Sequence, residues 1–231
     1  MNSMTWCAAP RPIAAAALLL GLCALCGESS CARAEEVEVR EFSVLVDGKP
    51  CGTYRMTITR KDEHTLTMSC QAEVRVKVAM ITAYRYSYNG VEVWKDGRLQ
   101  SLQSACNDDG KRSVVTATLD GKRLSVKVNG KEGDVRPDVW LTTFWSLPDA
   151  RQRSGAIPLL DADTGRYMDG QIQFVGTSTV HAAGQALTCS HYRVTSQSPH
   201  DVWFDSSERM VRQDWVEDGH RTCLILTRVQ R

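Results

Sequence analysis

The chain has 231 residues, with 28 basic and 27 acidic side chains and a formal net charge of +1. Lysine and arginine alternate with aspartate and glutamate throughout, so no basic stripe of the kind that binds nucleic acid is present. The balance of charge therefore excludes nucleic acid as an expected partner.

Residues 1–34 have the features of a cleaved export signal. Arg11 provides the positive charge, residues 13–25 form an apolar run, and Ala32-Arg33-Ala34 gives the small-x-small cleavage pattern. The run is shorter than the roughly 20 residues of a membrane-spanning helix. We predict an exported protein, periplasmic or extracellular, that starts near Glu35 and has no transmembrane span. Lipidation at Cys31 is the nearest alternative.

Turn signals divide the rest of the chain. Eight of the 16 glycines directly follow aspartate or asparagine, and such pairs favour the tight turns of β-hairpins. The pairs are Asp47-Gly48, Asn89-Gly90, Asp96-Gly97, Asp109-Gly110, Asp120-Gly121, Asn129-Gly130, Asp169-Gly170 and Asp218-Gly219. They predict an antiparallel meander.

Between these turns, apolar and polar residues alternate with the period of a β-strand. The first half of the chain predicts strands over 37–46, 53–59, 64–78, 91–96, 98–107, 111–119 and 123–129, with Tyr84, Tyr86 and Tyr88 continuing the alternation toward Asn89-Gly90. One apolar and one solvated face is the pattern of an antiparallel sheet with one buried side.

The alternation stops over residues 131–170. Trp140, Phe144 and Trp145 stand here at helical spacing, with Asp138 as a possible N-cap and Pro148 as a stop. We predict a short amphipathic helix and a loop in this insert. Strands resume over 171–180, 185–196, 200–205, 209–216 and 221–229.

These elements predict an all-β protein with a minor helix, in one domain over residues 35–231. Roughly ten or eleven antiparallel strands fit either a curved meander sheet, a half-barrel wrapped around the helical insert, or a closed up-and-down barrel. We favour the curved sheet, because the insert supplies an apolar plug.

Five cysteines lie outside the export signal, and an oxidising compartment would allow up to two disulfides among them. The candidate pairs are Cys51 with Cys70 and Cys189 with Cys223. Free buried thiols are an equal alternative.

Two motifs could carry hydrolase chemistry. Asp163-Thr164-Gly165 has the form of an aspartic peptidase loop, which would need a dimer, although it also fits a plain Asp-rich turn. Cys189 and His191 could form a nucleophile pair on one strand face. Both are weak signals, so we expect no catalytic residue, no metal site and no cofactor, and we favour a non-enzymatic role.

The segment Val93-Trp94-Lys95-Asp96-Gly97-Arg98-Leu99 and the later Asp109-Gly110-Lys111-Arg112 turn resemble a group of secreted bacterial domains of unknown function. The opening hairpin with Asp47-Gly48-Lys49-Pro50 fits the same group. This resemblance implies a distant likeness to the periplasmic lipoprotein carriers, in which a half-open sheet encloses a helix and an apolar groove.

The function expected from the sequence is that of a non-catalytic envelope protein holding a lipid or other apolar ligand in the groove of a curved sheet. Trp140, Phe144 and Trp145 would line this groove, because rigid aromatic surface suits such ligands. The alternatives are a hydrolase, or a structural module that pairs with a partner through its sheet edges.

Overall fold

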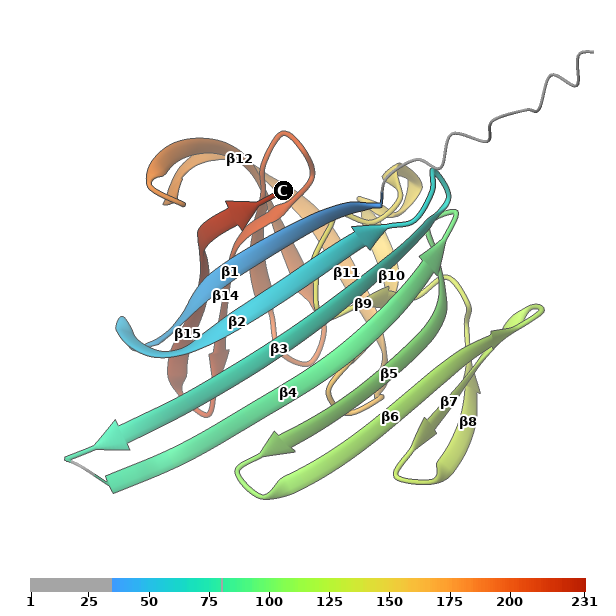
Figure 1. The fold of residues 1–231 in the computed structure, drawn as a ribbon, viewed down its shortest axis with the longest axis horizontal. Coiled ribbons are helices and arrows are strands. Elements are labelled where there is room, and N and C mark those ends of the chain that lie inside the picture. Colours follow the sequence, from blue (N-terminus) through green and yellow to red (C-terminus); the bar gives the residue numbers. More distant parts are fainter. Residues whose placement is uncertain (1–34, 80) are drawn as a thin grey trace, which may run out of the picture. The chain divides into compact units, whose positions relative to one another are not determined.

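The computed structural model describes residues 35–79 and 81–231, and the export signal and cleavage site predicted over 1–34 lie outside the described residues. Fifteen strands form one sheet, in the order β8-β7-β6-β5-β4-β3-β2-β1-β15-β14-β13-β12-β11-β10-β9 (Figure 1). Their bounds are β1 Glu36–Val46, β2 Lys49–Arg60, β3 Thr65–Val78, β4 Ile81–Lys95, β5 Arg98–Asp108, β6 Lys111–Asp120, β7 Arg123–Val128, β8 Lys131–Val135, β9 Trp140–Leu141, β10 Gly155–Leu160, β11 Tyr167–Ala182, β12 Gln185–Thr195, β13 His200–Phe204, β14 Met210–Glu217 and β15 His220–Gln230.

The predicted curved antiparallel sheet is confirmed. Every neighbouring pair is antiparallel except β9 and β10, and β1 joins β15, so the two halves of the chain meet in the middle of the sheet. The sheet curves strongly on itself (Figure 1), and its concave face carries the core. The closed barrel is not formed by strand pairing, because β8 and β9 remain edge strands.

Six of the eight predicted turn pairs lie at hairpin turns. At five of them both residues have positive φ, which is the geometry of the primed turns that connect adjacent antiparallel strands: positions 47–48, 96–97, 109–110, 129–130 and 218–219. At the sixth, Asp120 ends β6 and Gly121 begins the turn.

The other two pairs are inside strands, where the prediction of a turn was wrong. Gly90 lies within β4, and a Cβ there would lie 2.3 Å from the hydroxyl oxygen of Tyr88. Gly170 lies within β11, where a Cβ would lie 2.7 Å from a methyl carbon of Leu159. Both glycines make room for a buried side chain, which is the second common role of glycine in a strand.

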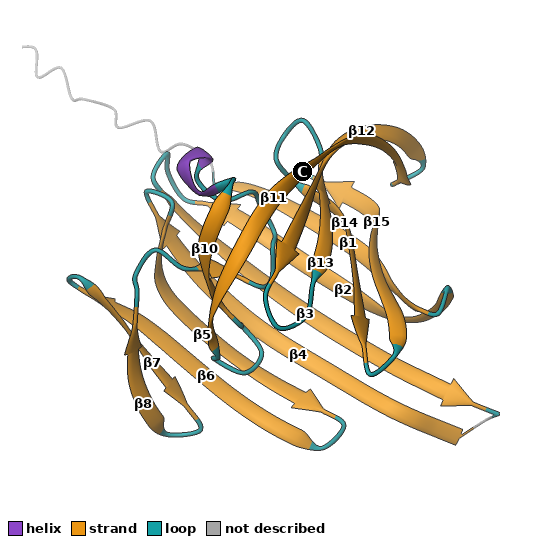
Figure 2. Cartoon of the chain, turned by 180° about the vertical axis from the view of Figure 1, so that it is seen from behind, coloured by secondary structure: helices purple, strands orange, loops and turns teal. Residues whose placement is uncertain are grey.

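No helix forms around Trp140, Phe144 and Trp145, so that prediction was wrong. Trp140 and Leu141 are β9, and Phe144 has a φ of 43°, which an α-helix does not accommodate. Its ring instead packs edge-on against Trp140, with centroids 4.6 Å apart. The helical structure of the insert is a single 3₁₀ turn, Ala150–Gln152 (purple in Figure 2).

The apolar insert that was predicted to fill the curve of the sheet is therefore a two-stranded ribbon, β9 with β10. Successive side chains of a strand point to opposite faces, and here both faces are covered. Trp140 and its register partner Leu159 belong to the larger core cluster, while Leu141 and its partner Leu160 belong to the smaller one, which β4–β7 also line. The ribbon thus divides the interior into two apolar cores.

The loop after β10 brings the two ends of the sheet together through side-chain contacts. Ser104 of β5 donates a hydrogen bond to the Ala162 carbonyl at 2.6 Å, and the Tyr86 hydroxyl of β4 donates to Asp163 at 2.6 Å. Gly165 packs so closely on Val128 of β7 that a Cβ would lie 2.4 Å from a valine methyl. The result is barrel-like without a closed hydrogen-bond ladder.

The predicted disulfides do not form: all five cysteines of the described residues are free thiols. Cys70 pairs in register with Met56, which places Cys51 about 16 Å away along β2. Two strands separate Cys189 on β12 from Cys223 on β15, a spacing of about 14 Å. Both spacings exceed what a disulfide can span.

Candidate functional site

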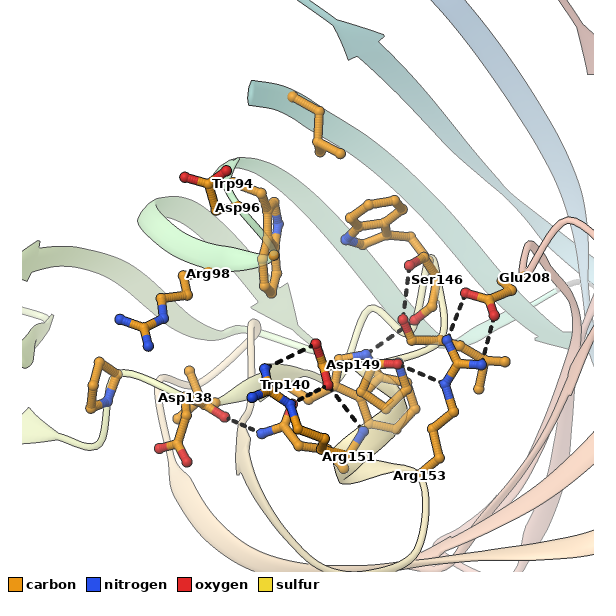
Figure 3. A pocket seen from close by; sticks show the side chains of 18 of the residues that line it. Trp94, Asp96, Arg98, Asp138, Trp140, Ser146, Asp149, Arg151, Arg153 and Glu208 are labelled. Carbon is orange, nitrogen blue, oxygen red and sulfur yellow. Dashed lines mark hydrogen bonds and ion pairs between the residues drawn. The ribbon is translucent and has the colours of Figure 1, made fainter. Parts of the chain in front are cut away.

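A pocket of about 460 Å³ opens where the β4–β5 turn faces the segment between β8 and β10 (Figure 3). We call it the tryptophan pocket, after Trp94, Trp140 and Trp145 in its lining. Its apolar lining is completed by Leu66, Pro137, Val139, Leu147 and Pro148. Its volume falls within the range of about 300–1,000 Å³ typical of small-molecule sites.

Two of the three indoles form a pair on the pocket wall. Trp94, near the end of β4, meets Trp145 edge-on, with ring centroids 6.1 Å apart. Trp140 is held by a hydrogen bond from its indole nitrogen to the Ser146 carbonyl at 3.1 Å. These contacts fix the orientation of the rings, so the pocket is preformed.

A buried carboxylate holds the indole pair together. Glu92 has no exposed surface, and it accepts hydrogen bonds from the indole nitrogens of Trp94 at 2.8 Å and Trp145 at 3.0 Å and from the Thr143 hydroxyl at 2.7 Å. Burial raises the pKa of Glu92 to about 7, against the lowering effect of these three donors. The Glu92 carboxyl thus contacts both indoles, Trp94 and Trp145, that line the pocket.

A buried guanidinium supports the same wall from behind. Arg40 of β1 is 6% exposed, donates to the Trp145 carbonyl and pairs with Glu38 at 2.7 Å. Glu38 also pairs with Arg209 at 3.4 Å. The network attaches the segment that carries Trp145 to β1 and to the start of β14.

The rim of the pocket carries charges of both signs. Arg151 pairs with Asp149 at 3.0 Å, and Arg153 pairs with Glu208 at 2.6 Å (Figure 3). Arg98 differs, since within the described part of the chain no ion pair or side-chain hydrogen bond engages its guanidinium. Its charge acts at longer range on Asp138, whose pKa is lowered mainly by the hydrogen bond from Arg136 and also by Arg98. The pocket therefore offers an aromatic wall and one uncommitted cation.

Two of the three residues predicted to line a ligand groove lie in the wall of the tryptophan pocket, and the third does not. Trp140 and Trp145 line the pocket, whereas Phe144 is fully buried in the core and does not. Their common setting is the β9 segment rather than a helix, because Phe144 turns back on Trp140 with positive φ.

Sequence reasoning missed Glu92 and Trp94 for a specific reason. The run Val91-Glu92-Val93-Trp94 alternates as though the valines faced the core, yet Val91 is 43% exposed while Glu92 and Trp94 point inward. The predicted turn at Asn89-Gly90 separated this run from the alternating Tyr84, Tyr86 and Tyr88, whereas in the structure both belong to β4, whose even-numbered residues face inward.

The Asp163 motif is an Asp-rich turn. The Asp161 carboxylate accepts hydrogen bonds from the Asp163 backbone nitrogen and the Thr164 hydroxyl, both at 2.9 Å, and Gly165 closes the turn onto the Asp161 carbonyl. Asp163 itself is half-buried against Tyr86, and burial, with the nearby Asp161, raises its pKa to about 7. It does not line the tryptophan pocket.

The Cys189–His191 pair is not assembled. Cys189 is buried in the core, and burial raises the pKa of its thiol to about 11, which keeps it protonated. His191 pairs with Asp201 at 2.7 Å and stacks on Trp203 at 4.3 Å. A bulge between Phe174 and Gly176 in the neighbouring strand β11 interrupts the register beside the two residues.

Among the described residues, no group of three or more histidine, cysteine or acidic side chains is arranged to hold a metal ion. The same residues contain no helix of the length and apolarity needed to cross a membrane.

Comparison with known proteins gives a family and a fold. The sequence model of a domain of unknown function, DUF6134, matches residues 42–227. The crystal structure of a beta-barrel-like protein of another domain of unknown function, DUF1849, from Brucella abortus is similar, with a TM-score of 0.62 and 10% sequence identity over 84% of this chain and 97% of that one. No curated protein matches the sequence. The resemblance to uncharacterised domains with a barrel-like fold is thus confirmed.

Proposed function

This chain belongs to the DUF6134 family of domains of unknown function, and we propose that it is an exported, non-catalytic binding protein whose tryptophan pocket holds an amphipathic ligand. The export signal predicted over residues 1–34 supports a location in the envelope or outside the cell. The observation that carries the proposal is a preformed aromatic pocket whose rim holds an uncommitted arginine.

The lining indicates the chemical class of the ligand. Trp94, Trp140 and Trp145 offer rigid apolar surface, which suits an acyl chain or a flat ring system. Arg98 at the rim suits an anionic end, because a guanidinium that forms no hydrogen bond with the protein can form charge-assisted hydrogen bonds with carboxylate or phosphate. We therefore propose a small lipid or other apolar molecule with one anionic group.

Binding of two fluorescent probes to the protein without residues 1–34, which contains all fifteen strands, tests this proposal. The anionic probe is 1-anilinonaphthalene-8-sulfonate and the neutral one is N-phenyl-1-naphthylamine. Trp145→Ala should weaken both by at least tenfold, because it removes a wall of the pocket. Arg98→Gln should weaken only the anionic probe, by about fivefold to tenfold, for the loss of one charge-assisted contact.

Arg112→Gln on β6 is the matched control, since Arg112 is exposed and lies outside the pocket. It should leave the Kd of both probes unchanged. Equal effects of Arg98→Gln and Arg112→Gln on the anionic probe would overturn the assignment of the anionic end. Unchanged binding in a folded Trp145→Ala variant would overturn the pocket itself.

Native mass spectrometry of the protein purified from its own envelope, followed by organic extraction, addresses the natural ligand. A released lipid-like mass supports the proposal. A bare protein mass, together with no binding of either probe, contradicts it and favours a module that pairs with a protein partner through its sheet edges.

A further inference from the structure

The hairpin of β3 and β4 extends beyond the rest of the sheet. The last pair of β3 with β2 is Val74 with Gly52, and the first pair of β4 with β5 is Tyr86 with Asp108. The strand residues of segments 75–78 and 81–85 therefore pair only with each other. We call these two segments the arm; its end lies at the lower left of Figure 1, past the ends of β2 and β5.

The tip of the arm is apolar and open to solvent. Val78 and Ile81 form its last register pair, and they are 63% and 75% exposed, the two highest values among the large apolar side chains described. A two-stranded ribbon is marginally stable in water on its own. Exposed apolar side chains at its end stabilise the protein only when another surface covers them and removes them from water.

The arm also concentrates positive charge. Arg75, Lys77 and Arg85 are all exposed, and its two segments contain no carboxylate. Arg75 and Arg85 are direct register partners, an arrangement that costs stability between like charges. This repulsion is relieved when an anionic surface approaches.

The acidic groups near the arm leave these cations available. Glu73 pairs with Arg75 only at 3.9 Å, with both side chains more than 60% exposed. Asp108 accepts the Tyr84 hydroxyl at 2.8 Å, and Asp109 touches the arm through its backbone nitrogen, which donates to the Arg85 carbonyl at 2.8 Å. Among the described residues, the exposed contact of Arg75 with Glu73 is the one ion pair that a cation of the arm makes.

We propose that the arm docks the protein onto an anionic lipid surface, with Val78 and Ile81 entering the interface and the three cations contacting headgroups. The spacing fits: at about 3.3 Å per residue, Lys77 lies about 3 Å and Arg75 about 10 Å behind Val78 along the strand. This matches the depth of roughly 5–10 Å over which interfacial segments bury apolar residues below charged headgroups.

Docking is separate from ligand binding in the tryptophan pocket. Leu66 and Trp94 of the pocket lie at the opposite ends of β3 and β4 from the arm, about 30 Å from its nearest residues and about 40 Å from its tip along the strands. Either activity can therefore fail in experiment without the other.

Co-sedimentation of the protein without residues 1–34 with phosphatidylcholine vesicles, with and without phosphatidylglycerol, tests the proposal. We expect binding only to the anionic vesicles, weakened by added salt. The variant Arg75→Gln/Lys77→Gln/Arg85→Gln should bind about a hundredfold more weakly, from roughly fivefold for each cation near the surface. Val78→Ser/Ile81→Ser should weaken binding by at least about tenfold, for the loss of two buried apolar side chains.

The matched control is Val114→Ser/Val216→Ser, since these valines are 54% and 53% exposed and lie outside the arm. It should bind anionic vesicles like the wild type. The proposal is overturned by absence of binding, by equal binding to neutral vesicles, or by arm variants that bind like the control. Cooperative urea unfolding of every variant would show that the fold is intact.

Discussion

At the scale of single residues, the most unusual group is the Glu92 carboxyl. It faces three neutral donors, Thr143 and the indoles of Trp94 and Trp145, and is removed from water. Removal from water destabilises the carboxylate form by more than these hydrogen bonds stabilise it, so the pKa of Glu92 rises to about 7. The group therefore titrates near neutral pH inside the wall of the tryptophan pocket.

The raised pKa predicts how stability depends on pH. The folded protein holds the Glu92 proton more tightly than the unfolded chain, so the stabilisation is complete below pH 4.5 and is lost as pH rises to about 7. The unfolding free energy of the wild type minus that of Glu92→Gln should fall by about 3 kcal/mol as pH rises across this window, at about 1.36 kcal/mol per pKa unit. Urea unfolding of both proteins at several pH values measures it.

Comparison with Glu92→Gln isolates this carboxyl from other buried groups. Asp163 has a raised pKa and titrates in the same window, while burial lowers the pKa of His200 to about 4, which contributes with the opposite sign. Both are present in wild type and variant, so they cancel in the difference. Stability curves that run parallel from pH 4.5 to pH 7 would refute the role of Glu92.

At the scale of elements, the β9–β10 ribbon organises the interior. Residues Ile157–Leu160 form an unbroken buried run, as expected of a strand covered on both faces. A continuous apolar run cannot be told from a buried helix by periodicity alone. The helix predicted for the insert depended instead on the spacing of Trp140, Phe144 and Trp145, and in the structure this spacing belongs to β9 and the residues after it, where Phe144 has positive φ.

Truncation of the ribbon should be costly. Leu160→Ala opens a cavity between β10 and the core formed by β4–β7, where Leu160 is fully buried. The expected loss of unfolding free energy is about 2–5 kcal/mol. The exposed control Val114→Ala should change it by less than about 0.5 kcal/mol. A small effect of Leu160→Ala in urea unfolding would mean that the ribbon is not an essential part of the core.

Glycines in hairpin turns and glycines inside strands differ in what requires them. Five of the Asp-Gly and Asn-Gly pairs have positive φ at both residues, which depends on the pair itself. Gly90 instead lies under the Tyr88 ring, and Gly170 against Leu159, contacts that depend on the folded neighbours. A dipeptide signal therefore identified the hairpins but could not distinguish a turn glycine from a packing glycine.

At the scale of the whole molecule, the free thiols show that the sheet needs no covalent link. Every one of the five lies on a strand, and Cys70, Cys106 and Cys189 are buried. We predict that the protein without residues 1–34 gives five reactive thiols in denaturant, and that in the folded state the partly exposed Cys51 reacts first. Cys223 is also partly exposed, but burial and the hydrogen bond with Asp214 raise the pKa of its thiol to about 12, so it should react more slowly. A reducing agent should leave the Tm unchanged.

Thiol titration with an aromatic disulfide reagent, before and after denaturation, checks this prediction. Fewer than five thiols in denaturant would reveal a disulfide and would contradict the structure. The separations of about 14–16 Å between the candidate partners are the physical reason to expect five.

The sequence by itself determined the meander, because strand alternation and hairpin turns are local properties that each segment carries alone. It also indicated that the aromatic residues of the insert lie inside the curve. Only the tertiary structure showed that strands β9 and β10, rather than a helix, fill the curve of the sheet, and that Glu92 faces inward between two indoles. It also showed that Trp94 lines the pocket and Phe144 does not. Those outcomes depend on which distant strands pair and in which register, and a register is shared between segments rather than written in one of them.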